Sequence, residues 1–203
     1  MNKKGFTLAE ILITLTIIGI VASLAIPSLI QSVQNNQYKT AWKSALSDLN
    51  QVNTRLLMDN GGTVNGVFLN DTDLVNKYSS YLSYIKKCPS GQNCWHVANN
   101  WYELNGNPRN ANYGEGLILS NGNLIGFYQE SQTCAYNGNG LPTCGYMYVD
   151  INGFKGPNTI GKDIYLVWIQ QNKITPAGAR DNYVNTCSTL GSGEGCSAQY
   201  LTQ

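Results

Sequence analysis

The stretch Gly5-Phe6-Thr7-Leu8-Ala9-Glu10 opens an apolar run that continues to Ile30. The 25 residues from Phe6 to Ile30 contain a single formal charge, at Glu10. As an α-helix they would extend roughly 37 Å, which is enough to cross a bilayer with some tilt. A carboxylate at mid-membrane costs about 2.5–3.5 kcal/mol, so Glu10 needs a shallow position or a partner. The stretch therefore predicts a membrane helix with one unusual acidic residue.

The residues that precede and open this run form a recognisable pattern, Lys3-Lys4-Gly5-Phe6-Thr7-Leu8-Ala9-Glu10. With the apolar run, the pattern resembles the class III signal sequence of the type IV pilin and type II secretion pseudopilin superfamily. In that family a prepilin peptidase cuts after the glycine and methylates the new amino terminus. The resemblance implies cleavage between Gly5 and Phe6. It also places Pro27 where many members carry a helix-kinking proline, and it covers residues 3–30 closely but says little beyond residue 57.

Glu10 has two interpretations. Cleavage before Phe6 would create an ammonium group near the membrane depth of Glu10 on a neighbouring subunit. That pair would remove two desolvation costs and set the subunit register. Alternatively, Glu10 lies only about 6 Å past Phe6, near the lipid headgroups, and stays solvated.

Two other interpretations of the apolar run fit less well or remain open. An ordinary secretory signal has an apolar core of about 7–15 residues and a small-residue cleavage site. This run is longer, and Ala25-Ile26-Pro27 is a poor site of that kind. A plain single-pass anchor remains an alternative.

Charge and cysteine content bear on topology and compartment. Lys3 and Lys4 precede the run and no strong basic cluster follows it, so the positive-inside rule places the N-terminus in the cytoplasm and the remainder outside. The resemblance makes this membrane the inner membrane, with later filaments in the periplasm or at the cell surface. Beyond residue 30, basic and acidic residues are equal in number, which gives no electrostatic case for nucleic acid.

Six cysteines in an exported segment suggest disulfides. Six cysteines allow 15 pairings, and their spacing favours three local loops, although connectivity stays open. Zinc is disfavoured because no C-x₂-C pair exists and His96 is the sole histidine. The favoured pairs are Cys88–Cys94, Cys134–Cys144 and Cys187–Cys196.

The domain organisation follows from the change in pattern along the chain. Residues 1–5 are the predicted leader, 6–30 the membrane and assembly helix, 31–60 its amphipathic continuation and 61–203 a globular head. An apolar stripe at spacings of three and four predicts that 31–60 packs on the head, and Asn60-Gly61-Gly62 ends the helix. The residues of the stripe are Tyr38, Trp42, Ala45, Leu49, Val52 and Leu56, with Ala41 and Leu46 beside them. Without a breaker between the halves, we expect one helix of about 50 residues.

The head is predicted to be α+β. Residues 73–85 suggest a short helix, and Asn121-Gly122 suits a type I′ turn between strands at 116–120 and 123–129. Further strands at 146–151 and 164–169 would complete a small antiparallel sheet on the helix, which is the lollipop arrangement of pilins. The chain from 178 onward is predicted to be an irregular tail tied by its disulfide.

The loop between the last two predicted strands is the one candidate metal site. Some pseudopilins hold calcium near this part of the head, and oxygen side chains with turn carbonyls suit that ion. The loop fails the EF-hand pattern, and its Asx side chains could instead bond their own backbone. The candidate ligands are Asp150, Asn152, Asn158 and Asp163.

No catalytic constellation stands out, so we do not expect an enzyme. His96 has no adjacent nucleophile and is expected to be a surface or loop residue, and there is no G-x-S-x-G, P-loop or H-E-x-x-H motif. Trp95, Trp101 and Tyr102 could stack on a sugar ring, but filling the core is favoured.

The resemblance implies a structural subunit that packs with copies or relatives, on an assembly platform in the inner membrane, into a pilus, a DNA-uptake fibre or a type II secretion pseudopilus. Neutral charge slightly favours the pseudopilus. The alternative function is an anchored or filament-tip adhesin that binds a glycan.

Overall fold

A computed structural model describes residues 5, 7–89, 94–111, 113 and 115–202. The chain divides into two compact units, Met1–Gln37 and Tyr38–Gln203. Helix α1 (Leu8–Asp59, 52 residues) runs through both and confirms the expected single long helix. It ends where predicted, because Gly61 and Gly62 have φ values of +70° and +87°, and the Gly62 N–H donates to the Leu57 carbonyl at 2.7 Å.

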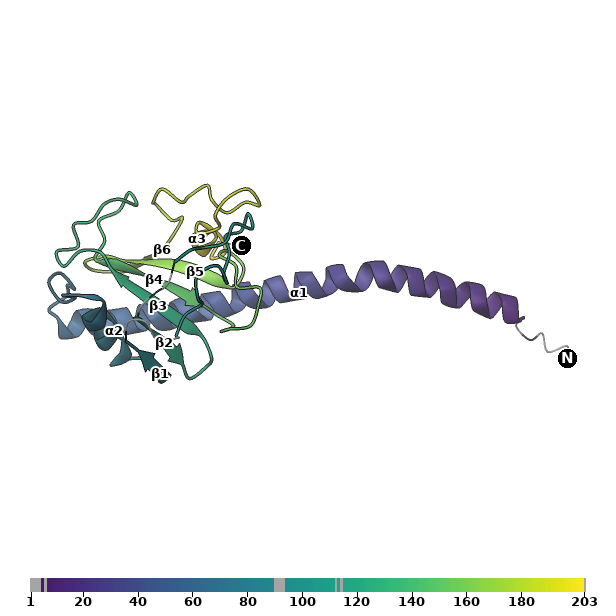
Figure 1. Cartoon of the computed structure of the whole chain (residues 1–203), viewed down its shortest axis with the longest axis horizontal. Helices are drawn as coiled ribbons and strands as arrows, with labels where there is room; N and C mark the ends of the chain where they lie inside the picture. Colours follow the sequence, from purple (N-terminus) through teal and green to yellow (C-terminus); the bar gives the residue numbers. More distant parts are fainter. Residues whose placement is uncertain (1–4, 6, 90–93, 112, 114, 203) are drawn as a thin grey trace. The chain divides into compact units, whose positions relative to one another are not determined.

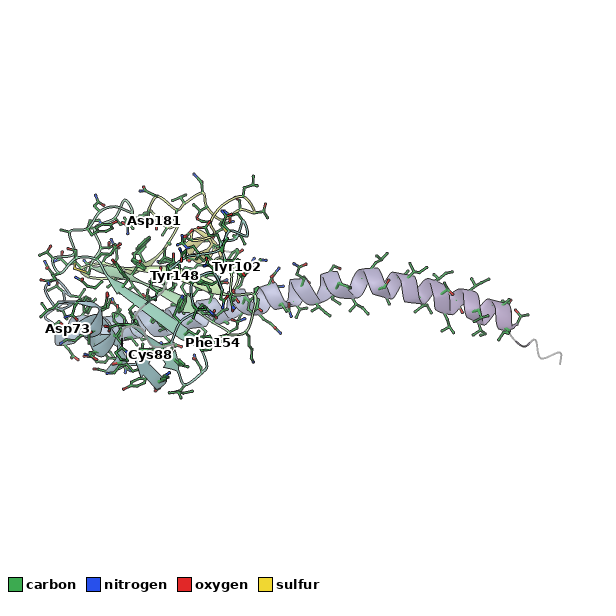
Figure 2. The ribbon with its side chains drawn as sticks, viewed as in Figure 1. Asp73, Cys88, Tyr102, Tyr148, Phe154 and Asp181 are labelled. Atoms are coloured by element: carbon green, nitrogen blue, oxygen red, sulfur yellow. A yellow bond between two sulfur atoms is a disulfide. The ribbon has the colours of Figure 1, made fainter. Side chains whose placement is uncertain are left out.

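In the first unit, apolar side chains extend on all sides of α1 (Figure 2). Leu12, Ile18 and Leu24 are 56, 63 and 74% exposed. The helix continues through Pro27, and the kink expected there stays a prediction. A helix that is apolar all round needs a non-aqueous or protein environment to be stable.

The second unit contains an antiparallel sheet in which each strand pairs with the next in sequence (Figure 1). A short helix, α2, precedes the sheet and a single turn, α3, follows it. The elements are α2 (Asp71–Ser79), β1 (Tyr84–Cys88), β2 (Glu115–Leu119), β3 (Leu124–Gln129), β4 (Gly145–Asp150), β5 (Ile164–Ile169), β6 (Ile174–Pro176) and α3 (Cys196–Gln199). The predicted α+β pilin-like class, with a long helix, a small antiparallel sheet and disulfide-tied loops, is confirmed.

The sheet is larger than predicted, and the helix expected over residues 73–85 was partly wrong. The Asn70 side chain accepts the Asp73 N–H, so α2 begins earlier, and it ends at Ser79. Tyr84 and Ile85 belong instead to β1, where Tyr84 pairs with Leu119. The pairing with β2 overrides their helical spacing. Strand β6 was also missed, and α3 interrupts the predicted irregular tail.

The predicted hairpin between β2 and β3 is present, but its turn is not type I′. Gly122 has a φ of +90°, whereas Asn121 is not in the left-handed region that a type I′ turn requires. The Gly122 N–H donates to the Leu119 carbonyl at 2.9 Å. The turn residues were therefore recognised correctly and the turn type was wrong.

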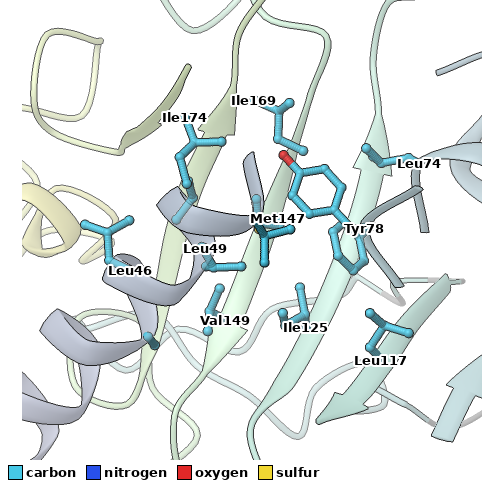
Figure 3. Packing of buried hydrophobic residues seen from close by; sticks show 14 of the residues in the cluster. Leu46, Leu49, Leu74, Tyr78, Leu117, Ile125, Met147, Val149, Ile169 and Ile174 are labelled. Carbon is cyan, nitrogen blue, oxygen red and sulfur yellow. The ribbon is translucent and has the colours of Figure 1, made fainter. Parts of the chain in front are cut away.

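The main core lies between the predicted stripe of α1 and one face of the sheet (Figure 3). Trp42 is fully buried, its ring stacks on Tyr165 at 4.5 Å between centroids, and its Nε1–H donates to the Ser197 carbonyl at 2.8 Å. Leu46 and Leu49 face Met147 and Val149 in the same cluster. The stripe thus positions the sheet on the helix.

The opposite face of the sheet is also covered. Tyr148 on β4, Leu166 and Trp168 on β5 form a second cluster with Trp95 and Trp101. Trp95 and Trp101 are buried, as the core interpretation expected, whereas Tyr102 is 39% exposed. The central strands are therefore buried on both faces and read as continuous apolar runs.

The structure contains the three local disulfides that the spacing favoured, Cys88–Cys94, Cys134–Cys144 and Cys187–Cys196. Each closes a loop of the second unit. The last one ties the C-terminal turn α3 to the preceding segment. In that turn, the Ser197 carbonyl accepts the hydrogen bond from the Trp42 Nε1–H.

Candidate functional site

The N-terminus of α1 carries a reciprocal cap built from Thr7 and Glu10. The Glu10 Oε2 accepts the Thr7 N–H at 2.7 Å and the Thr7 hydroxyl at 2.9 Å, and the Glu10 N–H donates to the Thr7 Oγ1 at 3.3 Å. This is a capping box, in which a Thr and a Glu three residues later satisfy each other's backbone N–H groups. The cap fixes the Glu10 carboxylate beside the helix start. Phe6 lies outside the described residues, while Gly5 is exposed.

The surface that follows this cap is apolar and unpartnered within its own unit. Within the described residues, α1 is the one helix long and apolar enough to cross a membrane. Its Thr and Ser side chains bond backbone carbonyls of the same helix, for example Thr16 to Leu12 at 2.7 Å and Ser23 to Ile20 at 2.8 Å. Their polar groups are thereby satisfied without water, as a lipid or protein environment requires.

The candidate calcium ligands come from one loop, but their carboxylates are already bonded. The Asp163 oxygens accept the N–H groups of Asn158 and Thr159 at 2.8 and 2.7 Å. The Asp150 Oδ1 accepts the Asn152 N–H at 3.0 Å. These are the Asx bonds that the alternative interpretation described.

Two side-chain amide oxygens in the loop favour the binding of a cation, whereas the arrangement of the acidic side chains does not. The Oδ1 atoms of Asn152 and Asn158 are buried without a hydrogen-bond partner. Across the described ranges, however, no three His, Cys, Asp or Glu side chains are grouped to hold a metal ion. The donor set fits calcium only in part, so calcium binding stays a prediction.

His96 lies in a loop, which the expectation of a surface or loop residue allowed, but it is buried there. It is 5% exposed, and its Nε2 lies 2.7 Å from the Oδ2 of the fully buried Asp150. Burial raises the pKa of Asp150 to about 6, and the hydrogen bond from His96 offsets part of that rise. The two residues are 54 positions apart, so no local motif could indicate the pair.

Comparison with known families agrees with the structure of the N-terminus. Residues 1–26 match the family described as the prokaryotic N-terminal methylation motif. No curated protein and no solved structure matched the chain. The motif points to a structural subunit rather than an enzyme, and it implies processing by prepilin peptidase and assembly with other pilin subunits.

The match and the apolar helix that begins within it are consistent with a membrane-anchored, single-pass protein. The chain is thus a precursor with a prepilin-type N-terminal signal, and its fold is consistent with the pilin superfamily.

Proposed function

We propose that the chain is a structural subunit of a pilin-like filament. It is cut between Gly5 and Phe6, methylated at Phe6, and held in the inner membrane with its head outside until assembly. The observation that carries the proposal is the exposed apolar surface of α1, which begins inside the methylation motif of residues 1–26 and contains a single carboxylate, Glu10. That surface would exchange lipid for neighbouring helices in the filament.

The capping box supports a defined place for Glu10 in this assembly. Its partner is Thr7, whose N–H remains an amide after cleavage before Phe6, so processing leaves the cap intact. The Glu10 carboxylate is exposed and could therefore receive the ammonium group of a neighbouring subunit while it caps its own helix. Such a charged pair, removed from water, would set the axial register.

Two variants separate the charge of Glu10 from its capping role. Glu10→Gln retains the oxygen that accepts the Thr7 N–H and removes the charge, whereas Thr7→Ala removes the Thr hydroxyl and retains the charge. We expect Glu10→Gln to abolish incorporation into sheared filaments and Thr7→Ala to reduce it only slightly. Normal incorporation of Glu10→Gln would refute the register role.

Mass spectrometry of the mature N-terminus tests the processing step. We expect a chain that begins at methylated Phe6, and a Gly5→Leu variant that retains its leader. An intact Met1 in the parent would contradict the proposal.

Among filaments, we favour the type II secretion pseudopilus, because the head is nearly neutral. If the filament is a pseudopilus, cells that lack this protein should accumulate normally secreted proteins in the periplasm. Loss of surface fibres with normal secretion would indicate a pilus instead.

A further inference from the structure

Two loops of the second unit present large apolar side chains to solvent at neighbouring positions. Phe154 lies in the β4–β5 loop, residues 151–163, and is 54% exposed (Figure 2). Val97 lies in a separate loop and is 51% exposed. The residue before it, His96, contacts the Phe154 ring at 5.6 Å between centroids. The two exposed side chains therefore lie close together, although they are far apart in the sequence.

Hydrogen bonds within the β4–β5 loop fix its shape on both sides of Phe154. The Asn152 Nδ2 donates to the Gly156 carbonyl at 3.2 Å. Further along, the Asp163 carboxylate accepts the Asn158 N–H at 2.8 Å. The loop therefore holds an aromatic side chain in water at a defined place, where burial against a partner would be favourable.

The β4–β5 loop lies at the end of the second unit where α1 enters it. The Asn152 Nδ2 donates to the hydroxyl of Tyr38, the first residue of that unit, at 3.4 Å. Residues 31–37 separate Tyr38 from Ile30, the last residue of the apolar run, and a helix over that interval rises about 12 Å. The headgroup region of a bilayer extends roughly 5–8 Å beyond its hydrocarbon core. A membrane that holds the apolar run therefore has its surface close to this loop.

The exposed charges of the β4–β5 loop are both positive. Lys155 and Lys162 are exposed, whereas the carboxylates of Asp150 and Asp163, at the two ends of the loop, are fully buried. Neither lysine forms an ion pair within the part of the chain that the structure describes. On the adjoining part of α1, Lys43 is exposed as well. This end of the unit thus combines cationic and apolar side chains.

That combination favours one kind of partner. The surface of a bilayer with anionic phospholipids supplies phosphate groups for the lysines and acyl chains for the apolar side chains. Each lysine near such a surface contributes roughly a fivefold factor to the contact. A second copy that packed through the same end would instead bring the lysines of both copies together, which is unfavourable.

We propose that the β4–β5 loop is a contact between the head and the surface of an anionic phospholipid bilayer. The inference rests on the proposed storage of α1 in a membrane before assembly. Phe154 and Val97 enter the boundary between headgroups and acyl chains, while Lys155 and Lys162 pair with lipid phosphates. The contact holds the head against the membrane and is released when the subunit joins a filament.

The test uses the burial of the native tryptophans. All four are 4% exposed or less, so lipid does not reach them, and Phe154→Trp adds one exposed indole. The full chain is reconstituted into vesicles of phosphatidylcholine alone, or of equal parts phosphatidylcholine and phosphatidylglycerol, with acyl chains brominated near the headgroups. Bromine should quench the emission that this variant adds over the parent, more strongly in the anionic vesicles. Absence of quenching, or equal quenching in both vesicles, would overturn the proposal.

Met58→Trp is the matched control. Met58 is 75% exposed in the last turn of α1, about 30 Å along the helix from Tyr38. The tryptophan added there should be quenched by acrylamide in the water but not by brominated lipid. Equal lipid quenching of both variants would overturn the assignment to the β4–β5 loop. Protection of the Phe154→Trp indole from acrylamide without lipid quenching, increasing with chain density, would mean that a second copy covers the loop instead.

Two further variants keep the test valid if Phe154→Trp disturbs the loop. Val97→Trp moves the probe to the neighbouring loop and should be quenched in the same vesicles. Replacing Lys155 and Lys162 by Gln in either tryptophan variant should remove most of the quenching, because the two fivefold factors are lost. Unchanged quenching would refute the pairing with lipid phosphates.

Flotation of the same vesicles measures membrane anchoring separately. A chain that floats with its vesicles but carries an unquenched probe would end this inference and leave the proposed function standing. A chain that does not float would contradict both.

Discussion

Replacement of Trp42 tests how the long helix is joined to the rest of its unit. The side chain is fully buried, stacks on Tyr165 and donates to the Ser197 carbonyl. Trp42→Ala removes all three contributions. Since Trp-to-Ala changes in cores cost about 3–5 kcal/mol, we expect a loss of that size in the free energy of unfolding.

Trp42→Phe separates packing from hydrogen bonding. Phe retains a ring that can stack on Tyr165 but leaves the buried Ser197 carbonyl without its donor. Such an unmet acceptor costs about 1–3 kcal/mol, so Phe should lie between the parent and Ala.

The assay is urea unfolding of the full chain in detergent, read by pulse proteolysis. Met58 on the same helix is 75% exposed, and Met58→Ala should change the free energy of unfolding by less than about 0.5 kcal/mol. If Trp42→Ala unfolded at the same urea concentration as Met58→Ala, the contact would not stabilise the unit and the reasoning would be wrong.

Three further predictions use the same assay or a thermal melt. Replacing both Cys187 and Cys196 by Ser should lower the free energy of unfolding by about 2–3 kcal/mol, because the unfolded chain regains the entropy of an open loop; an unchanged value would show that this loop closure contributes nothing. His96→Leu leaves a buried carboxyl at Asp150 without its partner and should cost about 3–5 kcal/mol at pH 8. The cost should be smaller at pH 5, because a carboxyl with a pKa raised to about 6 is protonated there, and a loss independent of pH would exclude this cause. If the loop of Asn158 takes calcium, millimolar Ca²⁺ should raise the melting temperature of the parent but not of Asn158→Ala, and an unchanged parent would argue against calcium.

Local sequence was sufficient for the features that depend on near neighbours. The apolar run after Phe6 and the stripe that contains Trp42 predicted one long helix, because helical side chains three and four positions apart share a face. The disulfides joined cysteines only 6, 10 and 9 residues apart. The capping box is also a local feature, because Thr7 and Glu10 have the spacing of three residues that it requires. That the box holds the Glu10 carboxylate was not anticipated.

The features that were missed depend on residues far apart in the chain. Tyr84 became a strand residue only through its pairing with Leu119. His96 became buried only because the end of β4 brings Asp150 to it. The spacing of apolar residues along the chain cannot predict such contacts, because in each case the partner lies more than 30 positions away.

The pocket on the face of β4 and β5 that points away from α1 shows the division most clearly. The sequence by itself determined which residues share a strand face, so that Tyr146 and Tyr148 had to lie on one side of β4. That loops cover this side and leave a pocket of about 170 Å³ there was decided only by the tertiary structure. The physical reason is that alternation along a strand is a local property of the backbone, whereas a cavity is the space left when distant segments pack together.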